Sequence, residues 1–188
     1  MKTACLILTS LMLSATFSWA ADDYRVLATN KTSTMEKEMN DAAAAGYHFQ
    51  GVMGGETGVG GNEVAVIMSR TSEAAPAKYS YKLLATQRTS TMEKELREAG
   101  LLGFQYRGQT IFKTAFGGEE IVVILERDGE TAPRGGYDYK LLATTKTSTM
   151  QKELQDAAAS GFTFVGVTVS KTAFGGKEIV SILRKQVE

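Results

Sequence analysis

A segment of 16 residues occurs three times in this chain, and this repetition constrains the fold more than any other feature. The copies occupy residues 24–39, 81–96 and 139–154, so they are offset by 57 residues (24 to 81) and then by 58 (81 to 139). The register continues through each unit, with matching residues at Gly46, Gly103 and Gly161, at Gly60, Gly117 and Gly175, and at Glu63, Glu120 and Glu178. Such a repeat predicts three copies of one small structural unit.

The spacing changes only between the units, which gives the expected boundaries. These are repeat 1 at residues 21–70, a linker at 71–78, repeat 2 at 79–127, a linker at 128–136, and repeat 3 at 137–188. Both prolines of the chain, Pro76 and Pro133, fall in the two linkers. Because proline is excluded from helix interiors and central strands, this placement supports the boundaries.

Each unit is expected to begin with a strand and to continue with a helix. In residues 79–86 the side chains alternate with the two-residue period of a strand. Ser33, Ser90 and Ser148 are the expected helix N-caps, each followed three residues later by Glu or Gln as in a capping box. The predicted helices each have one apolar stripe, formed by Met35, Met39, Ala42 and Ala43, by Met92, Leu96, Ala99 and Gly100, and by Met150, Leu154, Ala157 and Ala158.

Two further strands complete each unit. Alternating aromatic residues such as Tyr47 and Phe49 predict a second strand, and residues 120–125, which are mostly apolar on both faces, predict a central third strand. The predicted fold class is α+β, with three tandem β-α-β-β repeats, each a three-stranded, mostly antiparallel sheet (order 1-3-2) covered by one helix. One helix covers only one sheet face, and a unit of about 47 residues is near the lower limit for independent folding. We therefore expect the repeats to pack together through sheet faces or edges.

The N-terminus has the pattern of a secretory signal. Lys2 precedes an apolar run at residues 4–17, and Ser18-Trp19-Ala20 places small residues where a signal peptidase reads them. The run is shorter than the roughly 20 apolar residues of a spanning helix. We expect residues 1–20 to be a signal peptide cleaved after Ala20, and the protein to be exported to the periplasm or the extracellular space, with no membrane span in the mature chain.

Composition excludes several classes of function. Without residues 1–20 the chain loses Lys2 and keeps 20 Lys and Arg against 21 Asp and Glu, a net charge of −1. This balance gives no basic excess for nucleic acid. The only cysteine, Cys5, leaves with the signal, and His48 is the only histidine, expected on the solvent side of a strand. We therefore expect no catalytic residues, no metal site and no cofactor, and a protein that is not an enzyme.

The starts of the three helices are the strongest candidate site. Each combines a cation with hydroxyl groups where free N–H groups and the helix dipole favour an anion. The candidate anion-binding residues are Lys31 and Ser33, Arg88 and Ser90, and Lys146 and Ser148. The alternative is an ordinary helix cap beside a solvated base, because a capping box uses the donors that an anion would need.

Two phenylalanines and several glutamates are further candidates. Phe116 and Phe174 precede Gly-Gly turns, where an exposed ring can contact a partner; alternatively each ring folds back over a repeat. A carboxylate-dependent hydrolase is a weaker alternative, because it needs two carboxylates in one cleft. The recurring carboxylates are Glu38, Glu95 and Glu153, and Glu63, Glu120 and Glu178.

The unit also resembles a family of small, uncharacterised β-α-β-β domains. The segments that carry the resemblance are Tyr81-Lys-Leu-Leu, residues 92–103, Phe104, Gly117-Gly118 and residues 121–127, with equivalents in the other repeats. The resemblance implies the β-α-β-β fold and brings no activity. The leading hypothesis is an exported, non-catalytic binding or scaffolding protein, whose partner is an unidentified protein or small ligand. Small-anion or small-ligand binding at the three helix N-termini is the alternative.

Overall fold

The computed structural model describes residues 22–57, 61–71, 79–113, 119–131, 135–171 and 176–187. Repeat 1 consists of β1 (Asp23–Thr29), α1 (Thr32–Ala44), β2 (His48–Thr57) and β3 (Gly61–Arg70). Repeat 2 consists of β4 (Tyr79–Thr86), α2 (Thr89–Leu101), β5 (Gln105–Lys113) and β6 (Glu119–Asp128). Repeat 3 consists of β7 (Tyr137–Thr144), α3 (Thr147–Ala159), β8 (Thr163–Lys171) and β9 (Lys177–Gln186). The expected residues 1–20 of the signal lie outside the described residues.

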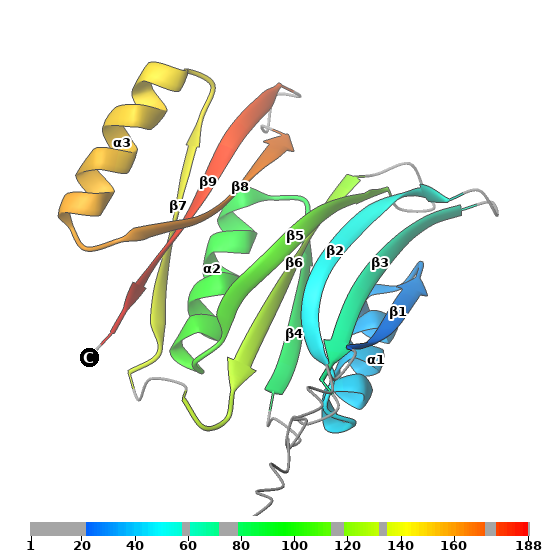
Figure 1. The fold of residues 1–188 in the computed structure, drawn as a ribbon. Helices are drawn as coiled ribbons and strands as arrows, with labels where there is room; N and C mark the ends of the chain where they lie inside the picture. Colours follow the sequence, from blue (N-terminus) through cyan, green and yellow to red (C-terminus); the bar gives the residue numbers. More distant parts are fainter. Residues whose placement is uncertain are drawn as a thin grey trace, which may run out of the picture.

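Each repeat forms its own three-stranded antiparallel sheet. The strand orders are β1-β3-β2, β4-β6-β5 and β7-β9-β8, so the last strand of every repeat is central. We call these sheets A, B and C. The predicted α+β class, the three β-α-β-β repeats and the 1-3-2 order are confirmed. Figure 1 shows the three repeats following one another across the molecule, from blue and cyan through green to yellow and red.

The helices begin earlier than the capping boxes predicted. The N-cap residues are Lys31, Arg88 and Lys146, and none of the three helices has a side-chain cap hydrogen bond. The prediction of Ser33, Ser90 and Ser148 as N-caps is therefore wrong, since each serine lies inside the first turn. The cause is the threonine that ends each first strand: the hydroxyl oxygens of Thr29, Thr86 and Thr144 accept the N–H groups of Lys31, Arg88 and Lys146 at 3.2, 3.3 and 3.1 Å. This short turn brings the chain into the helix two residues before the serine.

Hydrophobic cores are shared between successive repeats. The first core combines Met35, Met39, Ala42, Ala43, Tyr47, Phe49, Val64, Val66 and Met68 of repeat 1 with Tyr81, Val122 and Ile124 of repeat 2. The second combines Leu84, Met92, Leu96, Ala99, Phe104, Ile121, Val123 and Leu125 of repeat 2 with Tyr137, Tyr139, Leu141, Val180 and Ile182 of repeat 3. Sheet B thus has one face in each core. The expectation that the repeats pack together through their sheets is confirmed.

The first two helices each cover the following repeat more than their own. α1 contacts β4 more extensively than any strand of sheet A, and α2 contacts β7 more extensively than any strand of sheet B. β2 and β5 also contact each other across the first junction. Each shared core thus combines residues of two successive sheets with residues of the helix of the earlier repeat. At both junctions the helix of the earlier repeat covers the sheet of the later one.

The third helix makes extensive contacts only with its own repeat in the described part of the chain. Its apolar stripe matches those of α1 and α2, yet only Ala157 is buried, while Met150 and Leu154 are half-buried and Ala158 is exposed. The corresponding core is small, with Leu142, Ala157 and Leu183 as its buried members. α3 lies at the outer end of the molecule in Figure 1. Equivalent side chains of the three helices are thus buried to different extents, because their burial depends on contact with the next repeat.

Candidate functional site

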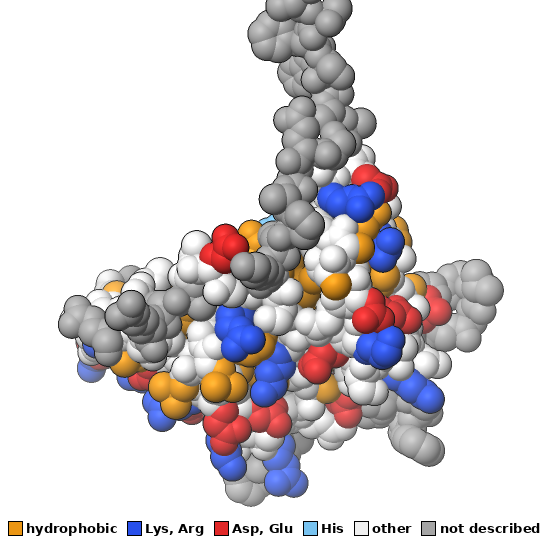
Figure 2. Space-filling view, turned by 90° about the horizontal axis from the view of Figure 1, so that it is seen from below, with side chains coloured by type: hydrophobic (Ala, Val, Ile, Leu, Met, Phe, Trp, Pro, Cys, Tyr) orange, Lys and Arg blue, Asp and Glu red, His pale blue; other side chains and the backbone are white. Residues whose placement is uncertain are grey.

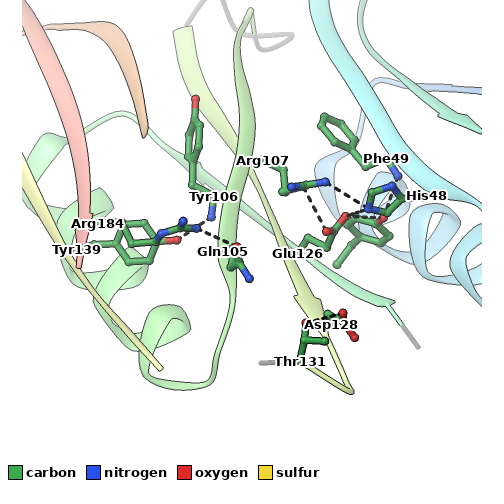
Figure 3. A network of polar contacts seen from close by, with 11 residues as sticks. His48, Phe49, Gln105, Tyr106, Arg107, Glu126, Asp128, Thr131, Tyr139 and Arg184 are labelled. Carbon is green, nitrogen blue, oxygen red and sulfur yellow. Dashed lines mark hydrogen bonds and ion pairs between the residues drawn. The ribbon is translucent and has the colours of Figure 1, made fainter. Parts of the chain in front are cut away.

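A buried carboxylate lies at the junction of repeats 1 and 2. Glu126, near the end of β6, accepts a hydrogen bond from the Tyr81 hydroxyl at 2.9 Å. It also lies 2.9 Å from His48 Nε2 and 3.3 Å from Arg107 Nε, while its own side chain is only 7% exposed. Figure 3 shows His48 and Arg107 converging on this carboxylate from β2 and β5. A buried carboxylate is stable only with such hydrogen-bonding and charged partners. Because His48 belongs to repeat 1 and Glu126 to repeat 2, this contact joins the two repeats.

The equivalent positions make a different polar contact at the second junction. Gln105 corresponds to His48, and Arg184 corresponds to Glu126, by the offsets of 57 and 58 residues. Arg184 Nη1 donates to Gln105 Oε1 at 3.1 Å, and both residues are drawn in Figure 3. The two junctions therefore have different polar pairs at equivalent positions of the repeat.

A tyrosine hydroxyl connects the repeats at both junctions. The Phe49 N–H donates to the Tyr81 hydroxyl at 2.9 Å, and the Tyr106 N–H donates to the Tyr139 hydroxyl at 2.7 Å. Burial, above all, raises the pKa of Tyr139 to about 12, and the pKa of Tyr81 is raised further still by burial and by the Glu126 charge. These hydroxyls are therefore neutral at physiological pH and act as fixed structural contacts.

Each junction also seats an aromatic ring against a glycine. A Cβ atom added to Gly108 would lie 3.3 Å from the Phe49 ring, and one added to Gly166 would lie 2.5 Å from the Tyr106 hydroxyl. These glycines make room for a ring of the preceding repeat. Gly51 is the equivalent in repeat 1, and a Cβ there would have nothing within 4 Å.

The helix also binds the edge of the next sheet. Asn40 of α1 donates to the Tyr81 carbonyl and accepts the Tyr81 N–H, both at 2.9 Å. Arg97, its equivalent in α2, donates from Nε to the Tyr139 carbonyl at 2.8 Å. Because β4 and β7 are edge strands, these contacts satisfy backbone groups that an open edge leaves to solvent.

An apolar sheet face is open at the N-terminal end of the repeats. Tyr24, Val26, Met53 and Ile67 share the outer face of sheet A, and we call them the head face. Tyr24 is 62% exposed and Val26 is 67% exposed, whereas the equivalent Tyr81 and Tyr139 are 3% and 0% exposed. The difference arises because, among the described residues, no helix of another repeat covers this face of sheet A.

A second apolar face is open at the other end. Phe164, Val167 and Val169 lie on the outer face of sheet C beside the half-buried Met150 and Leu154 of α3, and we call these five residues the tail face. Phe164 is 52% exposed, whereas the equivalent Phe49 is 6% exposed. Of the ten exposed large apolar side chains among the described residues, seven belong to these two faces. The exposed apolar surface is therefore concentrated at the ends of the repeat stack.

The predicted anion-binding residues stay apart as three exposed helix starts. The side chains of Lys31, Ser33, Arg88, Ser90, Lys146 and Ser148 are all exposed. At α2 the neighbouring Thr89 hydroxyl bonds to Glu178 Oε1 at 2.9 Å and to Ser170 Oγ at 3.2 Å, so a carboxylate of repeat 3 already lies beside that helix start. The structure thus gives the three starts different surroundings.

The remaining candidates are two phenylalanines and the recurring glutamates. Phe116 and Phe174 lie outside the described residues. Glu126 is the one buried acidic residue among the side chains whose burial is described, and cations and a tyrosine contact it instead of a second carboxylate. Glu95 and Glu153 lie on different helices, each with a buried oxygen that lacks a hydrogen-bond partner.

Neither a metal cluster nor a membrane span is found in the described part of the chain. No group of three or more His, Cys, Asp or Glu side chains there is placed to hold a metal ion. None of the helices described is both long and apolar enough to cross a membrane. Figure 2 shows acidic and basic side chains interspersed over one face, in keeping with 21 residues of each sign.

Sequence reasoning missed the cluster around Glu126. His48 was expected to face solvent, yet it is half-buried against Glu126. The available signal was the acidic residue at the end of an apolar strand, where the equivalent residues are Ser69 and Arg184.

The two open faces and the shared cores are the features from which a function must be inferred. The resemblance to small β-α-β-β domains stays a prediction. Comparisons with protein-family models, with curated proteins and with solved structures found no match to this chain.

Proposed function

We propose that this protein is an exported, non-catalytic binding or scaffolding protein that contacts its partners through the open ends of its repeat stack. The observation that carries the proposal is the pair of exposed apolar faces. Val26, 67% exposed on the head face, is equivalent to Leu83 and Leu141, which pack into the two shared cores. Binding of a partner that removes such an apolar surface from water lowers the free energy.

The cluster at Glu126 supports the non-catalytic part of the proposal. Its groups are bound to one another across a repeat junction, and the carboxylate is only 7% exposed. A group held in this way contributes to the cohesion of the repeats. The proposal of export is based on the sequence pattern of residues 1–20. N-terminal sequencing of the protein from its native host tests it. A chain that begins at Ala21 supports export, and a chain that keeps Met1 contradicts cleavage of a signal.

The test of the function is affinity capture from the native host extract, read by mass spectrometry. The wild type is compared with Val26→Asp on the head face, Phe164→Asp on the tail face, and the control Leu102→Asp. Leu102 is 59% exposed and lies in repeat 2, which contributes no residue to either face. We expect a partner, or a further copy of the chain, that the wild type and the control retain and at least one face variant loses. Identical captured sets for all four proteins would refute the proposal.

Anion binding at the helix starts is the second candidate. The specific observation in its favour is that none of the three helices has a side-chain cap, so the first-turn N–H groups are not consumed by hydroxyls. A thermal-shift screen with phosphate, sulfate and carboxylates tests it. Binding predicts a rise in melting temperature at millimolar anion that the variant Lys31→Ala/Lys146→Ala loses; no rise in the wild type contradicts it.

A further inference from the structure

We propose that the occupant of the head face is the tail face of a second copy of this chain, so that molecules join head to tail and continue the repeat stack. This inference rests on the proposed function and names the partner. Inside one chain the same junction is made twice, between repeats 1 and 2 and between repeats 2 and 3. Each end of the chain carries one half of that junction, and the two halves are complementary.

The apolar parts of the two faces correspond to surfaces that are already buried. Val26 and Ile67 of the head face are equivalent to Leu83 and Ile124 at the first junction and to Leu141 and Ile182 at the second. Met150 and Leu154 of the tail face are equivalent to Met92 and Leu96 of α2, whose side chains are completely buried. The ends thus present the same kinds of side chain, in the same places, as two junctions that do form.

The ring and the glycine that meet at each junction are also present at the ends. Phe164 is equivalent to Phe49 and Tyr106, which lie against Gly108 and Gly166. Gly51 holds the equivalent position on sheet A, where the space for a Cβ is open within 4 Å. Phe164 of one molecule can therefore lie against Gly51 of the next.

The hydrogen bonds of the junction have matching groups as well. The hydroxyl of Tyr24 is equivalent to those that accept the N–H groups of Phe49 and Tyr106, and the Phe164 N–H is the equivalent donor. Gln155 occupies the helix position of Asn40 and Arg97, and its amide can reach the Tyr24 backbone as they reach Tyr81 and Tyr139. An amide both donates and accepts, as Asn40 does.

The polar pair expected at the junction between two molecules contains no charged side chain. The first junction joins His48 to Glu126, and the second joins Gln105 to Arg184. The equivalent residues at the ends are Thr163 and Ser69, two neutral hydroxyl residues. Their contact buries no unpaired charge, which would otherwise oppose association.

A head-to-tail contact is heterologous, so it forms a ring or an open filament instead of a symmetric dimer. This gives a test that other modes of association cannot imitate. Val26→Asp blocks the head and leaves the tail intact, whereas Phe164→Asp blocks the tail and leaves the head intact. Both positions are exposed, so the substitutions should leave the fold unchanged, and circular dichroism and thermal unfolding check this.

The experiment is sedimentation velocity with purified protein produced from the full-length gene, across micromolar to millimolar concentration. We expect species larger than a dimer for the wild type and for the control Leu102→Asp. Each face variant alone should stay monomeric, and an equimolar mixture of the two should give a 1:1 dimer. In that dimer the intact tail of one molecule binds the intact head of the other.

Three outcomes would overturn the inference. A wild type that stays monomeric would refute the head-to-tail contact. If the capture experiment still finds a different protein whose binding depends on the head face, the proposed function stands although the head-to-tail contact does not. A dimer of either face variant alone shows a symmetric contact instead. Two folded variants that stay monomeric when mixed show that the faces do not bind each other.

Discussion

Leu96 and Leu154 occupy the same place in two helices, and truncating each to alanine measures how much the following repeat contributes. Leu96 is 0% exposed in the second shared core, whereas Leu154 is half-buried against a small terminal core. Fully buried Leu→Ala substitutions cost about 2 to 5 kcal/mol, because transfer free energy is lost and a cavity remains. We expect about 3 kcal/mol for Leu96→Ala and about 1 kcal/mol for Leu154→Ala, since the second side chain is only partly buried and belongs to a small core.

The assay is urea unfolding followed by circular dichroism and fluorescence, at a concentration where sedimentation shows the monomer. Coincident transitions and equal slopes allow the midpoints to be converted into free energies. The difference of about 2 kcal/mol corresponds to roughly 4 to 8 °C in melting temperature for a chain of this size. Equal costs for the two substitutions would show that the next repeat does not complete the core at Leu96.

Three more predictions follow from single contacts. Glu126→Ala should cost about 3 kcal/mol in urea unfolding, because it removes a buried charge from its partners, whereas Glu98→Ala, in an exposed helical ion pair, should cost under about 1 kcal/mol; equal costs would contradict the role of the cluster. Asn40→Ala should speed hydrogen exchange at the Tyr81 amide, because that N–H loses its acceptor, and unchanged exchange would show that the contact does not form in solution. Burial raises the pKa of Tyr139 from 10.0 to about 12, so the stability gained from its neutral form is complete below pH 10 and is lost, by up to about 3 kcal/mol, as the pH rises through 12. Tyr139→Phe should remove that part of the alkaline loss in unfolding experiments at pH 9 to 12, and a loss that is the same in both proteins would contradict the assignment.

Local sequence patterns predicted the unit and its pairing. The two-residue period of residues 79–86, the helical stripe and the doubly apolar third strand depend only on neighbours along the chain, so they indicated β4, α2 and β6 directly. The glycines that end the helices have left-handed backbones, for example at Gly46 with φ 87°, as a helix terminus favours. The packing of the repeats followed from a sheet with two apolar faces and only one helix.

The direction of packing could not be predicted from those patterns. Met92 and Met150 are identical residues at equivalent positions, yet one is buried and the other is half-buried, because only α2 has a repeat after it. The helix starts were misplaced because the capping serines competed with a threonine at the end of the preceding strand. The contact of His48 with Glu126 joins two different repeats. The spacing of residues within one repeat cannot predict such a contact.

Hydrogen exchange of the Tyr81 and Tyr24 amides measures whether α1 covers the second repeat. Asn40 of α1 accepts the Tyr81 N–H of β4, whereas among the described residues no helix of another repeat covers the equivalent Tyr24 of β1. In the monomer we predict slow exchange at Tyr81, because its N–H has a fixed acceptor, and fast exchange at Tyr24. Equal exchange rates at the two amides would show that α1 does not cover β4 in solution, and would contradict the packing of a helix on the repeat that follows it.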